Sequence, residues 1–127
     1  MATTAQTIQA TLGQPRLAVS GSITEADTGN TVQCVEIPAG AFVPPNGVTV
    51  YIAEVFAGGS PLLDVGDGTN TDAWVDQTEN TATTVGTYSG NLEFGLNGKY
   101  YATADTIDVV VSGSLTGGTA YVTMAAE

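Results

Sequence analysis

The sequence predicts an all-β protein, a single-domain β-sandwich or jelly-roll-like barrel of about eight to ten short, mostly antiparallel strands. Three observations lead to this prediction. Val, Ile, Tyr and Thr, which favour the pleated backbone, are frequent along the chain. The 16 glycines, many of them in Thr-Gly, Asn-Gly and Asp-Gly pairs, divide the chain at short intervals, as turns do. No segment repeats apolar residues at a sustained helical spacing.

In chain order, the first strands alternate with clear turn signals. Residues 1–12 are interpreted as an N-terminal arm or edge strand, and residues 13–127 as one β domain. Pro44-Pro45-Asn46-Gly47 is a strong turn signal, and the apolar run after it predicts a central strand covered on both faces. The expected strands span residues 6–12, 16–21, 31–37, 47–56, 62–65, 91–96, 98–103, 106–112 and 120–124.

The links between strands are predicted from their Gly, Pro, Asn and Asp residues. Asn97-Gly98 is a hairpin signal, and a final hairpin is expected to pair residues 106–112 with residues 120–124. Ile107, Val109 and Val111 then share one face of their strand. The other links are a polar loop at 25–30, a turn at 57–61, a loop at 66–72, and either a helical turn or a long surface loop at 76–90.

The charge balance limits the classes of partner. Thirteen acidic residues against two basic ones give a formal net charge of −11. Such a field repels nucleic acid, whose binding needs Lys and Arg on the phosphates, and it disfavours anionic membranes. We therefore expect no nucleic-acid partner and no membrane partner. The chain begins without the basic and apolar segments of a signal peptide, so synthesis in the cytoplasm without signal-dependent export is expected.

The residue inventory argues against catalysis. The chain has no histidine and one cysteine, so it offers neither a histidine-based triad nor a conventional zinc site. Phosphate-binding glycine motifs are also missing. Acids such as Glu54 and Asp76 could supply a glycosidase pair, but thirteen acids give such pairs by chance. The sequence predicts that the protein is not an enzyme and needs no cofactor.

One acidic segment has two interpretations. Asp64, Asp67, Asn70 and Asp72 lie in a Gly-rich stretch and offer the oxygen ligands that calcium prefers. Their spacing is not that of an EF-hand, and the favoured interpretation is a turn in which Asx side chains bond their own backbone amides. Trp74, just after this stretch, is interpreted as a loop anchor in the core, with a ligand platform as the alternative.

Two further residue types are assigned to the interior. Cys34 lies within an apolar run and is interpreted as a buried free thiol, with an intermolecular disulfide as the alternative. Tyr100 and Tyr101, like the other tyrosines, are interpreted as half-buried strand residues rather than as a binding surface.

Three segments together carry a resemblance to a known class of proteins. They are Val-Glu-Ile-Pro-Ala-Gly at 35–40, Leu-Asp-Val-Gly-Asp-Gly-Thr at 63–69, and Tyr-Tyr-Ala-Thr-Ala-Asp-Thr-Ile-Asp-Val at 100–109. An extended apolar strand at 48–56 lies between the first two. In this order they resemble segments of the head decoration (cement) proteins of tailed bacteriophages and of related virion modules. The resemblance covers roughly residues 31–124, and the first thirty residues match nothing.

The resemblance implies a structural role on the virion. Such proteins are small, β-rich and often trimeric, and they bind the major capsid protein on the exterior of the shell. The expected partners are therefore the major capsid protein and a homotrimer of the chain itself. The N-terminal arm could add a strand to a neighbour's sheet, with Thr7, Ile8 and Leu12 as contacts and Trp74 as a further contact. The alternative is a tail, fibre or spike module that binds host-surface glycans.

Overall fold

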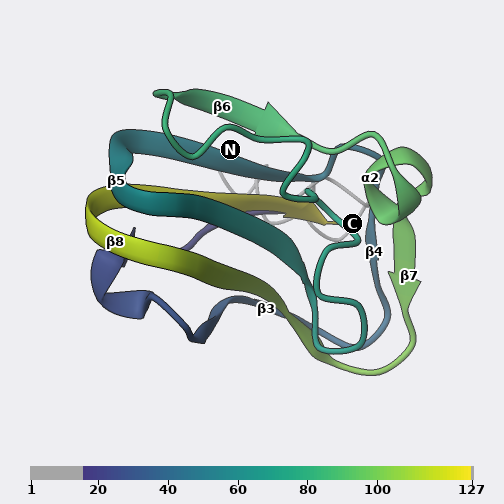
Figure 1. Ribbon diagram of the computed structural model, residues 1–127. Coiled ribbons are helices and arrows are strands. Elements are labelled where there is room, and N and C mark those ends of the chain that lie inside the picture. Colours follow the sequence, from purple (N-terminus) through teal and green to yellow (C-terminus); the bar gives the residue numbers. More distant parts are fainter. Residues whose placement is uncertain (1–15, 127) are drawn as a thin grey trace, which may run out of the picture.

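The computed structural model describes residues 16–126 (Figure 1). The predicted arm over residues 1–12, with Thr7, Ile8 and Leu12, lies outside the described residues. The elements are β1 (Arg16–Val19), β2 (Ile23–Thr24), the 3₁₀ helix η1 (Glu25–Asp27), β3 (Thr31–Ile37), β4 (Ala41–Val43), β5 (Val48–Asp67), β6 (Gly86–Ser89), α2 (Glu93–Asn97), β7 (Lys99–Tyr101) and β8 (Asp105–Ala126). The predicted all-β fold is confirmed, and every strand pairing is antiparallel.

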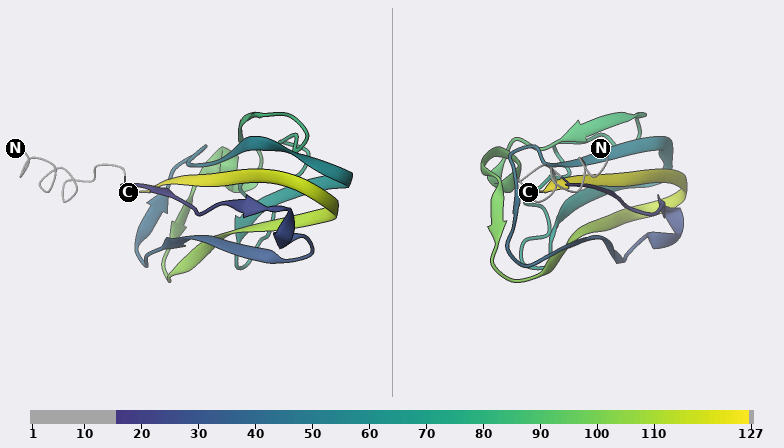
Figure 2. Two further views of the ribbon diagram at one scale, coloured as in Figure 1. Left: turned by 90° about the vertical axis from the view of Figure 1, so that its left-hand side faces the viewer. Right: turned by 180° about the vertical axis from the view of Figure 1, so that it is seen from behind.

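Two long strands, β5 and β8, form the frame of the molecule. They pair from Val48 opposite Met124 to Asp67 opposite Ile107. Figures 1 and 2 show that both strands bend at the same end of the molecule and turn back. The first layer thus contains β1, the second half of β8, the first half of β5, and β6. The second layer contains β3, the first half of β8 and the second half of β5.

The predicted turn at 57–61 and the predicted final hairpin were wrong. Both segments continue their strands through the bend, and residues 106–112 and 120–124 pair with β5 rather than with each other. Bulges allow this, because the β5–β8 register shifts four times between Ile52 and Leu62. A glycine-rich bend and a glycine-rich hairpin loop look alike in sequence, so local composition could not separate them.

The bend depends on glycine at particular positions. Gly58 and Gly118 have φ values of 112° and 135°, which side chains of L-residues rarely adopt. A Cβ atom on Gly118 would overlap the ring of Phe56, which is 1% exposed and fills the bend from inside. Gly117 has open space at the same position, so it is not constrained in this way.

The hydrophobic core lies between the two layers. The predicted face of Ile107, Val109 and Val111 is buried, as is that of Ala120, Val122 and Met124. The prediction that the strand from residue 47 is covered on both faces was wrong. Val48, Val50 and Ile52 are buried, but Tyr51 is 42% exposed. The apolar run at 48–53 thus has only one buried face, and its outward positions are Thr49, Tyr51 and Ala53.

The end of the molecule opposite the bend differs from the prediction. The expected strand over 91–96 is the short helix α2, and β7 pairs with β4, a strand that was not predicted. The Asn97-Gly98 pair does reverse the chain, but as a helix terminus: Gly98 has φ 73°, and its N–H donates to the Phe94 carbonyl. The expectation of a helical turn or a long surface loop at 76–90 was wrong for residues 86–89, which form β6 and pair with β5, a long-range contact that local composition does not indicate. The 3₁₀ helix η1 lies within the expected polar loop.

The predicted strand over residues 31–37 is confirmed as β3. Within residues 16–126, no helix has the length and the hydropathy needed to cross a membrane.

Candidate functional site

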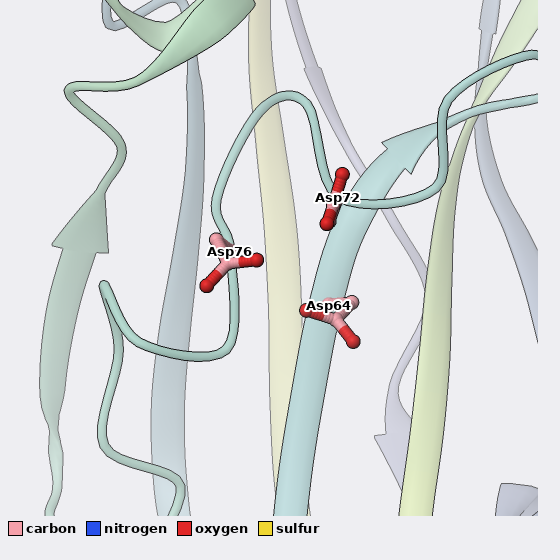
Figure 3. A group of neighbouring side chains, drawn as sticks. All are labelled: Asp64, Asp72 and Asp76. Atoms are coloured by element: carbon pink, nitrogen blue, oxygen red, sulfur yellow. The ribbon is translucent and has the colours of Figure 1, made fainter.

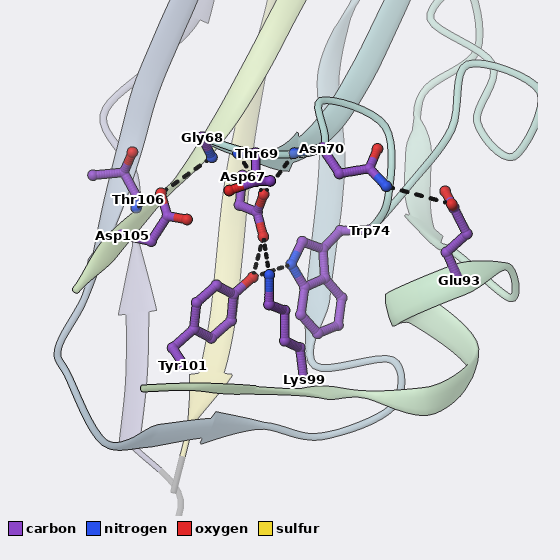
Figure 4. Close-up of polar contacts among 10 residues, drawn as sticks. All are labelled: Asp67, Gly68, Thr69, Asn70, Trp74, Glu93, Lys99, Tyr101, Asp105 and Thr106. Atoms are coloured by element: carbon purple, nitrogen blue, oxygen red, sulfur yellow. Dashed lines mark hydrogen bonds and ion pairs between the residues drawn. The ribbon is translucent and has the colours of Figure 1, made fainter. Parts of the chain in front are cut away.

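A buried polar cluster connects the end of β5 with β7. Asp67 ends β5, and its side chain has no exposed surface. The hydroxyl of Tyr101 donates to Asp67 Oδ2 over 2.7 Å and accepts from Trp74 Nε1 over 3.0 Å (Figure 4). Lys99 Nζ lies 3.4 Å from the same carboxylate oxygen. These four residues are called the Asp67 cluster below.

The second oxygen of Asp67 holds the following turn. Asp67 Oδ1 accepts from the backbone N–H groups of Thr69 and Asn70, each over 2.9 Å. This is the Asx turn that the sequence favoured over a calcium site. Both oxygens of Asp67 are thus engaged, and the side-chain amide of Asn70 donates to Glu93 Oε1 instead. Asp67 and Asn70, two of the four predicted calcium ligands, are therefore hydrogen-bonded within the protein.

Burial and hydrogen bonding act in opposite directions on Asp67. Burial raises its carboxyl pKa, but hydrogen bonds from Tyr101 and from the amides of Asn70 and Thr69, with the charge of Lys99, outweigh burial. The pKa of Asp67 therefore lies below its usual range, and the group is ionised at neutral pH. Burial and the bond to Asp67 raise the pKa of Tyr101, which keeps its hydroxyl protonated as a donor.

Aromatic contacts complete the cluster. The Trp74 and Phe94 rings meet edge to face, with centroids 5.7 Å apart. Lys99 Nζ lies 4.5 Å from the Phe94 centroid and 4.8 Å from that of Tyr101, within the range of cation–π attraction. Trp74 is fully buried, which is the position expected of a loop anchor. It presents no surface to a partner or a glycan, so it contributes to binding only by supporting the fold.

Three other carboxylates lie together on the surface (Figure 3). One ligand oxygen from each of Asp64, Asp72 and Asp76 lies within 4.8 Å of the other two. The predicted calcium ligands grouped Asp64 and Asp72 with Asp67 and Asn70, and did not include Asp76. The bridge between Val65 and Val75 brings Asp76 beside β5, and no local sequence signal indicates that contact.

The three carboxyl groups of this trio shift one another's pKa values. Burial raises the pKa of Asp64, and the charges of Asp76 and Asp72 add to the effect. The pKa of Asp72 is raised by burial and by Asp76, whereas hydrogen bonds from Thr78 lower the pKa of Asp76. Asp64 Oδ1 also accepts from the Gln77 amide over 2.8 Å. The trio has the oxygen ligands that suit a hard cation, but Asp64 already accepts from a backbone amide, and Asp76 accepts from the amide and hydroxyl of Thr78.

An open groove lies where β3 ends and β8 begins. Its volume is about 660 Å³, and its lining includes Glu36, Ile37, Pro38 and Asp105. Ile37 lies opposite Asp105 in the β3–β8 ladder, and Asp105 Oδ1 accepts from the amides of Gly68 and Thr106. Segments from all three parts of the resemblance thus meet beside the Asp67 cluster, where they hold strand ends together.

Comparisons with known proteins place the fold. No protein-family model matches the chain, and a comparison with curated protein sequences also finds no match. Among solved structures, a chain from "Cyanophage Pam1 capsid asymmetric unit" matches with a TM-score of 0.66. The match covers 90% of this chain and 84% of that chain, at 17% sequence identity. At this identity the similarity shows a shared fold.

Proposed function

We propose that the protein is a structural component of a bacteriophage capsid, and specifically that it decorates and stabilises the outer surface of a tailed-phage shell. The observation that carries the proposal is the fold match to a chain of the Pam1 capsid asymmetric unit. Because the match covers most of both chains, the two are of similar size, which fits a small accessory chain. The three sequence segments that resemble decoration proteins give independent support.

The physical character of the surface fits a protein that acts through many contacts. Stabilising a shell needs no reaction centre, and the chain lacks histidine. The most organised polar cluster, around Asp67, is buried and holds strands together rather than facing solvent. The proposed role is accordingly not catalytic. Repeated copies gain avidity without a deep binding pocket, because each contact is made at high effective concentration once the first has formed.

The proposed partners are the major capsid protein and further copies of this chain, forming a homotrimer. The acidic surface suits docking on a basic patch of the shell. Residues 1–12 carry no charged side chain, and their Thr7, Ile8 and Leu12 are the proposed contacts for adding a strand to a neighbour's sheet.

The alternative role in host-glycan binding has less support than the capsid role. Its candidate site combined the 64–72 segment with Trp74 as a stacking platform. Trp74 is 0% exposed, and Asp67 is 0% exposed and fully hydrogen-bonded. We therefore retain the capsid role as the proposal.

The test is co-sedimentation of the purified full chain with expanded shells that lack it. We expect saturable binding at a fixed copy number and a higher temperature of shell disruption. Deletion of residues 1–12 should weaken binding, and the double variant Ile8→Ser/Leu12→Ser should weaken it in the same direction. Unchanged binding after the deletion would remove the arm from the proposal. If the chain does not co-sediment with shells but is retained by cell-wall polysaccharide, the proposed capsid role is wrong.

A further inference from the structure

The acidic residues are unevenly distributed along the chain. The first of the thirteen is Glu25, and the only charged residue before it is Arg16. Residues 25–127 contain all thirteen acids and a single base, Lys99. Residues 1–15, called the N-terminal segment below, thus belong to the longest stretch without an acid. This segment can approach an acidic surface of a second copy without the repulsion that like charges in an interface produce.

The strand β3 offers a free edge in the second layer. Among the strands of residues 16–126 it pairs with β8 alone, so no described strand lies on its other side. A register shift between Gln33 and Val35 and the charge of Glu36 interrupt this edge. Bulges and charges of this kind disfavour pairing between the β3 edges of two copies, which would bring like charges together. An extended segment without acids does not meet this repulsion.

The groove at the end of β3 adjoins this edge. Gln33, Glu36, Ile37 and Pro38 lie on β3 or directly follow it, and residues 104–106 form the other side where β8 begins. The lining combines two carboxylates, from Glu36 and Asp105, with apolar side chains. Such a lining suits an extended segment that carries apolar side chains and no acid.

The N-terminal segment has these properties in its sequence. The strand predicted over residues 6–12 has seven residues, as β3 has. In an extended conformation Ile8 and Leu12 fall on one face and Thr7 and Gln9 on the other. Strand addition at a sheet edge takes affinity from backbone hydrogen bonds and specificity from alternate side chains. The segment offers both without a charged side chain.

The N-terminal segment joins the fold at the end of the molecule where the groove lies. Arg16 pairs with Ala126 at the end of β8, and Ile37 pairs with Asp105 at its beginning. Both ends of β8 lie opposite the bend, because the strand turns back there (Figure 1). Fifteen extended residues span up to about 50 Å, whereas a domain of this size has a radius of gyration of about 13 Å. The segment is therefore long enough to reach the groove of a neighbouring copy.

We propose that the N-terminal segment of one copy docks in the groove beside β3 of a neighbouring copy and adds a strand to that edge. The inference rests on the proposed function for the donor, an arm that contacts a neighbour, and adds the site that receives it. Each copy then donates one segment and receives another. Such a head-to-tail contact closes into a ring when the rotation between copies allows it, as in the proposed homotrimer.

The first experiment measures the mass of the full chain against concentration by sedimentation equilibrium. Ala104→Trp fills the groove from an exposed position and should weaken self-association at least roughly tenfold. The matched control is Ala26→Trp, because Ala26 is exposed in η1 and does not line the groove. In the segment, Gln9→Lys should tighten association and Gln9→Glu should weaken it, since the groove carries Glu36 and Asp105. Circular dichroism and thermal unfolding check that each variant is folded.

The second experiment mixes two defective variants. Ile8→Ser/Leu12→Ser impairs the donor segment and leaves the groove intact, whereas Ala104→Trp blocks the groove and leaves the segment intact. Each variant alone should associate weakly. An equimolar mixture should form heterodimers, because the intact segment of one variant meets the intact groove of the other. Unlike a loss of stability, this recovery requires that segment and groove bind each other between copies.

Several results would overturn the inference. One is a wild-type chain that stays monomeric at every accessible concentration, and another is a mixture that does not associate. Equal effects of Ala104→Trp and Ala26→Trp would also overturn it. If these results occur while the chain still binds shells, the inference is wrong and the proposed capsid role stands. If the mixture associates but the wild-type chain does not bind shells, the inference stands and the capsid role is wrong.

Discussion

Replacing Tyr101 by phenylalanine removes one hydroxyl group that makes two buried hydrogen bonds. The hydroxyl donates to Asp67 Oδ2 over 2.7 Å and accepts from Trp74 Nε1 over 3.0 Å. Within residues 16–126, no buried side-chain polar atom lacks a partner, so an unpaired indole N–H would be a defect that the native protein does not have. The substitution therefore leaves Trp74 with an unpaired buried N–H and Asp67 with one donor fewer.

Both losses contribute to the expected destabilisation. A hydrogen bond to a charged group contributes about 1.5–3 kcal/mol, and an unpaired buried donor costs about 1–3 kcal/mol. Because the two effects share one atom and local relaxation offsets part of them, we expect the free energy of unfolding to fall by about 3 kcal/mol. For a domain of this size that corresponds to a melting temperature lower by about 10 °C.

The assay is urea unfolding at pH 7 followed by fluorescence of Trp74, the only tryptophan in the chain. The matched control is Tyr100→Phe, because Tyr100 is 60% exposed and its hydroxyl has no side-chain partner among the described residues. The control should change stability by less than about 0.5 kcal/mol. Equal effects of the two substitutions would refute the reasoning that the Asp67 cluster stabilises the junction of β5 and β7.

The same cluster predicts how stability depends on pH. The pKa of Asp67 is lowered in the folded state, so its contribution is present above the unfolded value of about 3.9 and is lost as pH falls further. The pKa of Tyr101 is raised, so its contribution is present below the unfolded value of about 10 and is lost as pH rises above it. Tyr101→Phe should therefore flatten the alkaline limb of the stability profile relative to Tyr100→Phe.

Three other changes test separate parts of the structure. Asp64→Asn keeps the acceptor for the Gln77 amide but removes a carboxylate whose pKa is raised by burial and by its acidic neighbours. Allowing for solvent screening, the substitution should raise the free energy of unfolding at pH 7 by about 0.5 kcal/mol. The gain should vanish below about pH 4, where the carboxyl group of the native protein is protonated in both states. Gly118→Ala should destabilise by about 3 kcal/mol in chemical denaturation, and Gly117→Ala by far less; similar values would contradict the account of the bend. Burial, with the charge of Asp108, raises the pKa of Cys34 to about 12. A thiol reagent at pH 8 should therefore modify Cys34 slowly in the folded chain and fast in the unfolded chain, because the thiolate is the reactive form. Rapid labelling of the folded protein would contradict this.

Local patterns predicted the all-β class, several of the strands and some of their inward faces. The strand over residues 31–37 has the predicted bounds, and the alternation at Ile107, Val109 and Val111 identified their buried face. The buried face could be predicted because side chains alternate between the two faces along any β-strand, whichever strand pairs with it. The Asx turn at Asp67 was also predicted, since it depends on residues only two and three positions further along the chain.

Contacts between distant residues could not be predicted in this way. Tyr101 lies 34 positions after Asp67 and 27 after Trp74, and only the pairing of β7 with β4 brings these side chains together. Asp76 reaches Asp64 through an isolated bridge. Whether a glycine-rich segment bends a strand or ends it also depends on what pairs beside it. The local patterns of a single sequence do not indicate which distant segments pair.

The positions of the three resembling segments bear on where binding specificity lies. Ile37 pairs with Asp105, Asp105 accepts from the Gly68 amide, and Asp67 accepts from Tyr101. Each segment therefore supplies a contact that closes the fold, and a likeness in these segments indicates a common architecture rather than a common binding site. The proposed capsid contacts then lie at outward positions, which the fold leaves free. Substitution of an outward residue should leave the free energy of unfolding nearly unchanged, whereas substitution at Tyr101 should lower it.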